Sequence, residues 1–485
     1  MKYIKIKYLV LLGVSFVALA SCDKVKDFGN TNNNPNQTTS PIPSALLTNV
    51  ISRMGGDLVY DAGGVNTGAG LYAQLFSETQ YTEVSRYNKP TYNYDNPYYA
   101  GPLEDLQNII NYNSDPSTAS IAAQYGSNKN QIAIARILKA HYFKMLTDAV
   151  GDIPYSAALK GVGTVAYDKQ QDIYKDLFKE LKEAVDQFDD GTPAKGDILF
   201  GGDNAKWKKY ANSLRLLLAL NLQKVDAATG KAEFNAALTH SAGVISSNAD
   251  NVTVQYPGGN YPNPFYNYYN ITQRKDYAVS KTMTDRLSST SDPRLAAYAE
   301  NSTGFPYGLT RDNAVAFANA NPAWSYVLAA AYRQDATPVV VIGAANILLA
   351  RAEAAQLGWT SENVATLYAN GIMASLQQWG VYSAATFATY MANASVALTP
   401  GTEMQKIATQ EWLAWYPNGL EAWDVYRRTG YPTLTPAPGL TAIPRRMPYG
   451  TNDYSLNPAN AQEAANRYTV NGVSDSQYGR VWWDK

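Results

Sequence analysis

Apolar residues recur at helical spacing along several long stretches of the chain. The clearest stretch covers residues 130–150, where basic side chains lie opposite an apolar face. That face carries Ile134, Leu138, Tyr142, Met145 and Ala149. A repeat of this period predicts an amphipathic helix. Similar patterns predict helices over residues 44–54, 71–78, 101–112, 172–188, 204–224, 232–246, 346–357, 361–379 and 420–428.

Short breaks separate several of these predicted helices, so they are expected to pack as helix pairs. Gly358 ends one helix and Ser361 begins the next, while Gly430 and Pro432 end a later one. Repeated helix-turn-helix units at loosely similar spacing indicate a tetratricopeptide-like array. The expected fold class is therefore all-α, and such an array can grow as one domain in a chain of 485 residues.

Three internal segments interrupt the helical pattern, at residues 81–99, 251–270 and 301–324. They are rich in Tyr, Asn and Pro, and the whole chain has 37 Tyr against 12 Phe. Tyrosine combines an apolar ring with a polar tip, which suits a binding surface better than a core. Because binding residues concentrate in loops held by a rigid frame, these segments are the expected place for a ligand site.

The N-terminus has the composition of a bacterial lipoprotein signal. Three lysines precede an apolar stretch, residues 8–20, that is too short to span a bilayer comfortably. It leads into Leu-Ala-Ser-Cys, which resembles a lipobox, and Cys22 is the only cysteine in the chain. We therefore expect cleavage before Cys22 and lipid attachment to it. The alternative is an ordinary signal peptide followed by a chance cysteine.

This interpretation divides the chain into three parts. Residues 1–21 form the signal peptide, and residues 22–43 form a polar tether without periodicity. Residues 44–485 form a single helical domain. Each buried lipid CH2 contributes about 0.8 kcal/mol, so several acyl chains on one residue anchor a protein without a transmembrane helix.

Charge and motif content argue against several functions. The net charge is −1, and it becomes −4 once the three lysines of residues 1–21 are removed, so nucleic acid is not an expected partner. The chain has no Gly-x-Ser-x-Gly motif, and its two histidines, His141 and His240, are far apart. We therefore expect no enzyme activity, metal or cofactor. Carboxylates are plentiful, however, so a surface glycoside hydrolase stays open as an alternative.

Four stretches of sequence resemble one known family. They are GDIPYSAAL at residues 151–159, LEAWDVYRRTGYP at 420–432, IPRRMPY at 443–449 and the terminal VWWDK. Together with the lipobox, they resemble the SusD/RagB family of outer-membrane nutrient-binding lipoproteins. The resemblance implies tetratricopeptide-like helix pairs as a scaffold, with irregular loops that hold the ligand site.

The same resemblance implies a function and partners. It implies a lipoprotein that is anchored in the outer membrane of a Bacteroidetes-type organism and faces outward. There it would act as a lid on a SusC-like TonB-dependent transporter, to which it delivers its ligand. An oligosaccharide is the first expected ligand, and a peptide is the alternative.

Candidate ligand contacts come from the irregular segments. Aromatic faces can cover the C–H surfaces of a sugar, and polar side chains can bond its hydroxyls. The candidate aromatic residues are Tyr81, Tyr87, Tyr92, Phe265, Tyr266 and Trp324. The candidate polar residues are Arg86, Asn93 and Asn96. The alternative is that these rings pack locally and rigidify the loops. That two segments meet at one site is an implication of the family, since no spacing shows it.

Overall fold

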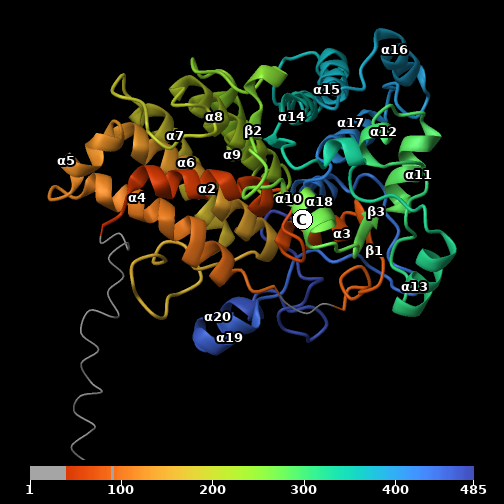
Figure 1. Ribbon diagram of the computed structural model, residues 1–485, viewed down its shortest axis with the longest axis horizontal. Helices are drawn as coiled ribbons and strands as arrows, with labels where there is room; N and C mark the ends of the chain where they lie inside the picture. Colours follow the sequence, from red (N-terminus) through yellow and green to blue (C-terminus); the bar gives the residue numbers. More distant parts are fainter. Residues whose placement is uncertain (1–39, 89–91) are drawn as a thin grey trace, which may run out of the picture. The chain divides into compact units, whose positions relative to one another are not determined.

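Helices that follow one another in the sequence form the frame of the protein (Figure 1). The computed structural model describes residues 40–88 and 92–485, and Pro43–Lys485 group into one unit. The first half of the frame consists of α2 (Pro43–Asp57), α4 (Glu104–Ser114), α6 (Asn128–Val150), α7 (Gln170–Gln187), α8 (Asn204–Asn221) and α9 (Ala227–Leu238). Here α4 packs on α2 and α6, α7 packs on α6 and α8, and α8 packs on α9.

The second half of the frame consists of α14 (Ala344–Gln356), α15 (Val364–Gln378), α17 (Glu403–Ala414) and α18 (Gly419–Thr429). In this half α14 packs on α15 and α17, and α17 packs on α18. Because α8 also packs on α14, the two halves share one main hydrophobic core. The expected all-α fold class is confirmed.

A short helix, α3 (Val65–Tyr72), crosses α18 at unusually close range. A Cβ on Gly419 would lie 2.1 Å from the carbonyl oxygen of Asn66 and 2.3 Å from the amide nitrogen of Gly70. Only glycine fits at this crossing, since a side chain there would overlap the backbone of the facing helix.

Two small antiparallel sheets lie beside the helical frame. The first pairs β1 (Phe76–Glu78) with β3 (Tyr277–Val279), so that Ser77 lies opposite Ala278. The second pairs β2 (Val252–Val254) with β4 (Val339–Ile342). Each sheet joins segments that are far apart in the sequence.

Shorter helices occupy the connections between these elements. They are α5 (Ala119–Ala122), α10 (Pro264–Tyr266), α11 (Lys281–Ser289), α12 (Leu295–Tyr298), α13 (Arg311–Ala320), α16 (Ala384–Ala392), α19 (Thr451–Leu456) and α20 (Pro458–Asn466). Two connections are π-helical, η2 (Asp95–Leu103) and η5 (Asn267–Ile271), and three are 3-10 turns, η3 (Ala123–Tyr125), η4 (Asn248–Asp250) and η6 (Ala330–Tyr332).

Three sequence expectations about local structure were wrong. Residues 71–78 do not form a helix, because α3 ends at Tyr72 and the chain then enters β1. The predicted helix at 232–246 begins earlier, as α9, where the Asp226 side chain accepts from the Thr229 amide. The segments 251–270 and 301–324 are not irregular throughout, since the first contains α10 and most of η5 and the second contains α13. By contrast, α6 and α18 lie close to their predicted bounds, and Gly430 closes α18 in the left-handed conformation.

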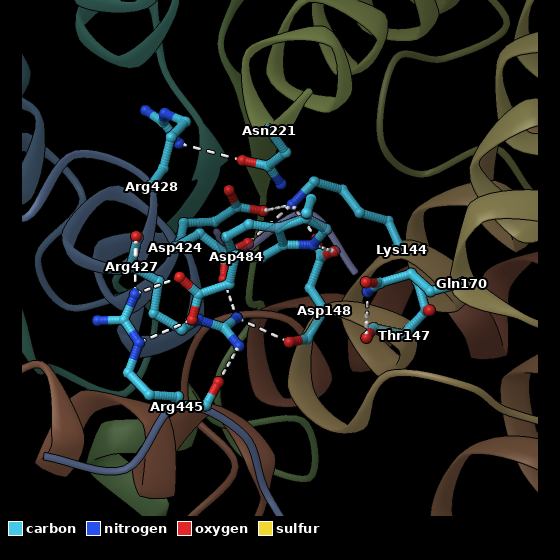
Figure 2. A network of polar contacts seen from close by, with 12 residues as sticks. Lys144, Thr147, Asp148, Gln170, Asn221, Asp424, Arg427, Arg428, Arg445 and Asp484 are labelled. Atoms are coloured by element: carbon cyan, nitrogen blue, oxygen red, sulfur yellow. Dashed lines mark hydrogen bonds and ion pairs between the residues drawn. The ribbon is translucent and has the colours of Figure 1, made fainter. Parts of the chain in front are cut away.

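A buried network of charged side chains joins α6 to α18 (Figure 2). The ammonium nitrogen of Lys144 lies 2.7 Å from Glu421 Oε1, 3.0 Å from Asp148 Oδ2 and 3.4 Å from Asp424 Oδ2. The indole nitrogen of Trp483, near the C-terminus, donates to Asp148 Oδ1 at 2.8 Å. The network therefore ties the last residues of the chain to the helical frame.

The family-like sequence stretches supply most of this network. In α18, Arg427 pairs with Asp424, and Arg428 lies 2.7 Å from Glu353 Oε2 on α14. Arg445, from IPRRMPY, pairs with Asp484 of the terminal VWWDK (Figure 2). Residues from three of the stretches that carry the resemblance thus hold the frame together inside the protein.

The described residues lack two kinds of feature, a membrane-spanning helix and a metal-binding cluster. No helix in residues 40–88 and 92–485 has both the length and the apolar character needed to cross a membrane. Within the same residues, no group of three or more His, Cys, Asp or Glu is arranged to hold a metal ion.

Candidate ligand-binding site

Tyr81 and Trp324 lie in the lining of one surface depression of about 410 Å³. This first depression also contains Gln80, Arg274 and Asp276. Tyr81 follows β1 and is 44% exposed, whereas Trp324 follows α13 and is half-buried. Two candidate residues that are far apart in the sequence therefore share one surface.

Pairing to β3 brings these segments together (Figure 1). Beyond the end of β1, the Thr79 amide donates to the Asp276 carbonyl at 2.9 Å, which places Tyr81 beside residues 273–276. On the other side of β3, the Val279 amide donates to the Ser325 carbonyl at 3.1 Å. Trp324, the residue before Ser325, is held next to the same strand.

Aromatic neighbours fix the orientation of the two rings. Trp324 packs edge-on against Phe305, with ring centroids 5.7 Å apart, and against Tyr326 at 4.8 Å. The guanidinium of Arg311, on α13, lies 5.2 Å from the centre of the Tyr81 ring, within the range of a cation–π contact. Both rings are therefore preorganised by the protein itself.

Two charged groups that line the first depression, Arg274 and Asp276, pair with each other, and Lys275 lines it as well. Arg274 donates from Nε to Asp276 Oδ2 at 2.6 Å, and this contact raises the pKa of Arg274. Asp276 also accepts from the Gln80 amide at 2.6 Å and from the Tyr268 hydroxyl at 2.9 Å. Burial raises the pKa of Tyr268, so its hydroxyl keeps the proton that it donates.

A second depression of about 560 Å³ adjoins the first and shares Arg274 and Asp276 with it. Tyr268 and Tyr277 contribute aromatic surface to it, and Asn267 contributes an amide. Arg274, Asp276 and Tyr277 are not among the residues predicted from the sequence. Their only signal was the position of QRKDY directly after a tyrosine-rich segment.

Three of the candidate aromatic residues are buried and line none of the surface depressions around Arg274. Phe265 is 1% exposed and stacks on Tyr60, with centroids 4.2 Å apart. Tyr87 is 4% exposed, and its hydroxyl accepts from the Ala437 amide at 3.1 Å. Tyr92 is equally buried, close to Gly68 on α3. These three rings pack inside the protein, as the alternative to ligand contact predicted.

Two candidate polar residues bind other parts of the chain. Arg86 donates from Nη1 to the carbonyl oxygens of Gly308 and Pro438, at 2.9 and 3.2 Å. The Asn93 side-chain oxygen accepts from the Thr451 hydroxyl at the start of α19, at 3.2 Å. Both residues fasten loops to each other.

The remaining candidates have other positions. Tyr266 is half-buried in α10 and lines neither depression. Asn96 belongs to η2, but its side chain is outside the described part of the structure, and Cys22 also lies outside the described residues. Tyr81 and Trp324 are thus the candidates that the structure brings together at a surface.

A more enclosed cavity of about 230 Å³ lies elsewhere, beside the turn between α17 and α18. Buried residues such as Phe265, Leu328 and Trp415 form much of its wall. It is smaller than the depressions around Arg274 and lies below the usual volume of a pocket for a drug-sized ligand. An oligomer has more room in the open depressions.

A frame of paired helices, with an aromatic and polar depression among its loops, defines a helical binding protein. The family model described as "Starch-binding associating with outer membrane" matches residues 35–450, and the chain belongs to this SusD-like family. Members of the family are binding proteins that associate with the outer membrane at the cell surface.

Solved structures agree with this assignment. A chitin-binding protein is 30% identical with a TM-score of 0.75, and the match covers 91% of this chain and 100% of that one. A SusD homologue from Bacteroides uniformis is 27% identical with a TM-score of 0.75, covering 91% of this chain and 99% of the other. A chitin-binding SusD homologue from Flavobacterium johnsoniae is 25% identical with a TM-score of 0.72, covering 91% and 98%. No curated protein sequence matches the chain.

Proposed function

We propose that this protein is a cell-surface nutrient-binding lipoprotein that captures an oligosaccharide in the first depression. The observation that carries the proposal is the meeting of Tyr81 and Trp324 in one depression with Gln80, Arg274 and Asp276. Aromatic faces and hydrogen-bonding side chains side by side suit the two kinds of surface on a sugar. The family description and the chitin-binding relatives support the same ligand class.

The composition of the site favours carbohydrate binding over the two alternatives. Its Arg274–Asp276 pair leaves no unpaired carboxylate for the terminal amine of a peptide. Among the described lining residues of the first and second depressions, Asp276 is the single carboxylate, whereas glycoside hydrolysis usually requires two. Binding without hydrolysis is therefore the proposed activity.

Anchoring and delivery complete the proposal. Cys22, after the apolar signal sequence, would carry the lipid, and residues 22–43 would tether the domain to the outer membrane. The protein would then close as a lid over a SusC-like TonB-dependent transporter and hand over its ligand. Family membership supports this partnership by analogy.

The ligand proposal is tested by titrating the purified mature protein with chitin and starch oligosaccharides and with peptides, using calorimetry. We expect at least one of the glycans to bind with a dissociation constant of about 1 μM to 1 mM, since a delivery protein must release its ligand. Tyr81→Ala should weaken binding about fivefold, the equivalent of one stacked ring at about 1 kcal/mol. Tyr382→Ala is the matched control, because Tyr382 is similarly exposed but lies outside the depressions.

Other outcomes would identify an alternative. If peptides bind and none of the glycans does, the ligand is a peptide and not an oligosaccharide. Release of shorter sugars during the titration, lost on Asp276→Asn, would identify a hydrolase and refute the proposal. For the transporter, gentle detergent extraction from native membranes should recover a TonB-dependent barrel with this protein, and repeated recovery of the protein alone would contradict the partnership.

A further inference from the structure

A third depression continues the row formed by the first two. It has a volume of about 740 Å³ and shares Pro264 and Asn267 with the second depression. Its far wall is the side of α2 that carries Ser52 and Arg53. In Figure 1, the elements α2, α10 and β3 follow one another from left to right.

The size of this row exceeds what a short ligand can fill. Each depression alone, at about 410, 560 and 740 Å³, falls within the range of a pocket for one drug-sized molecule. Because neighbouring depressions share lining residues, they adjoin each other, and one long ligand can contact more than one of them. The shape therefore suits a linear chain of several units.

Tyr261 provides an aromatic surface at the far end of the row. It lines the third depression and is 66% exposed, the largest exposed fraction among the large hydrophobic residues described. It closes a tight turn that begins at Gly258, whose carbonyl accepts from the Tyr261 amide at 3.2 Å. Gly258 and Gly259 both have positive φ, at 77° and 62°, which favours glycine at these two positions.

The turn that carries Tyr261 is held firmly from behind. The Asp335 carboxylate accepts from the Gly259 amide at 2.9 Å, and the Asp335 carbonyl accepts from the Asn263 amide at 2.8 Å. The Asn263 side chain in turn donates to the Thr337 carbonyl at 2.7 Å. An exposed ring on a fixed turn loses little freedom when a ligand covers it, so it is a suitable platform for stacking.

Charged side chains along the row are available to a sugar without being separated from each other. At the third depression, Arg53 Nε lies 3.1 Å from Asp57 Oδ2, and its Nη2 donates to the Pro97 carbonyl at 2.9 Å. At the boundary of the first two depressions, Arg274 pairs with Asp276, and Lys275 adds a further basic side chain to the first depression. Sugar hydroxyls can bond the remaining donors and acceptors of these side chains while the ion pairs stay intact.

We infer that Tyr261 forms a distal subsite, so that an extended oligosaccharide runs from Tyr81 and Trp324 to this ring. The inference rests on the proposed function and adds chain length and the distal subsite to it. One end of the oligosaccharide occupies the first depression, and only longer chains extend from there to Tyr261. Affinity should therefore increase with chain length, and Tyr261 should matter for long chains alone.

The test compares disaccharides with hexasaccharides in calorimetric titrations of the purified mature protein. The probes are chitobiose and chitohexaose, with maltose and maltohexaose as a second pair. For the pair that binds, we expect the hexasaccharide to bind at least about tenfold more tightly than the disaccharide. Tyr261→Ala should weaken hexasaccharide binding about fivefold and leave disaccharide binding unchanged.

Three further variants separate the distal subsite from simpler explanations. Tyr261→Phe should keep hexasaccharide affinity, because stacking needs the ring and not the hydroxyl. Tyr81→Ala should weaken both lengths, and Tyr382→Ala should weaken neither. A longer chain also gains affinity from its greater number of binding registers, but that gain would survive Tyr261→Ala.

The possible failures are distinguishable. If neither pair of glycans binds, the proposed carbohydrate function fails and this inference fails with it. If glycans bind but Tyr261→Ala has the same affinity as the parent protein for the hexasaccharide, the distal subsite is refuted while the proposed function stands. If Tyr261→Ala weakens the disaccharide equally, the row is a single short site and the inference is refuted.

Discussion

Replacing Lys144 with methionine tests the buried network that joins α6 to α18. The side chain of Lys144 is 1% exposed, and three carboxylates lie within 3.4 Å of its ammonium nitrogen. Burial alone would lower the pKa of Lys144, but these carboxylates outweigh burial and raise it. Methionine keeps most of the volume and removes the charge, so Asp148, Glu421 and Asp424 would lose their shared cation.

The expected loss of stability is about 3–5 kcal/mol, the usual result of removing one partner from a buried ion pair. Each contact at about 3 Å has a Coulomb energy of roughly 5 kcal/mol at an effective dielectric constant near 20, and the desolvation of Lys144, which the variant avoids, offsets part of it. Arg427 remains beside Asp424, which also limits the loss. A free energy of unfolding of about 5–15 kcal/mol would be reduced substantially.

The effect should depend on pH in a defined direction. Burial, together with nearby Asp148, already raises the pKa of Asp424 to about 6, and burial also raises that of Glu421. Without Lys144 both pKa values rise further, so the folded variant binds protons that the unfolded chain does not. Its stability then increases as pH falls through these values, and the deficit relative to the parent protein should shrink between about pH 7.5 and pH 5.

Urea unfolding followed by circular dichroism measures this deficit at each pH. Lys139→Met is the matched control, because Lys139 lies on the same helix and donates to the neutral Gln107 side chain at 2.7 Å. A loss below about 1 kcal/mol near pH 7.5, equal to that of the control, would refute the structural role of the network. A deficit that grows on acidification would refute the assigned direction of the pKa shifts.

Three other predictions concern packing, titration and anchoring. Gly419→Ala should destabilise the protein by about 1–3 kcal/mol, because its Cβ would overlap the Asn66 backbone, whereas Gly163→Ala should be neutral; equal melting temperatures would contradict this. Burial raises the pKa of the Asp61 carboxyl to about 6, so protonation of Asp61 stabilises the folded protein fully below about pH 4, and this stabilisation is lost as pH rises through about 6. Asp61→Asn should therefore flatten the plot of melting temperature against pH in this range, and an unchanged slope would count against the assignment. Cys22→Ser should release the protein from membranes, and fractionation with the outer membrane after salt washing, in cells without the transporter, would disprove lipid anchoring.

The sequence predicted the elements whose pattern is local. Residues 130–150 became α6 with nearly the same bounds, because a long apolar stripe is followed by the break at Gly151. The helix that ends at Gly430 was equally clear. The prediction failed at residues 71–78, where the glycines before them allow α3 to pack against α18 and leave the following residues to a strand. That contact joins residues about 350 positions apart, so no local pattern indicates it.

The site was predictable only in part for the same reason. Tyr81 and Trp324 meet because β1 pairs with β3 and Ser325 bonds to Val279, and neither contact leaves a mark on local composition. Family resemblance indicated that two segments would meet, but only the structure identifies which residues do. Arg274 and Asp276 went unnoticed because a charged pair in a loop looks like ordinary solvated surface in the sequence.

The excess of tyrosine has a structural explanation that the sequence interpretation missed. Long irregular segments carry backbone carbonyls that need donors once they are buried. A tyrosine can fill apolar space with its ring and donate from its tip, as Tyr99 does to the Pro154 carbonyl at 2.5 Å and Tyr368 to the Val396 carbonyl at 2.8 Å. A core lined with loops therefore favours the hydroxylated ring. Tyr81 and Tyr261 differ because their rings are exposed on fixed backbone, and exposure, not abundance, marks the tyrosines that are available to a ligand.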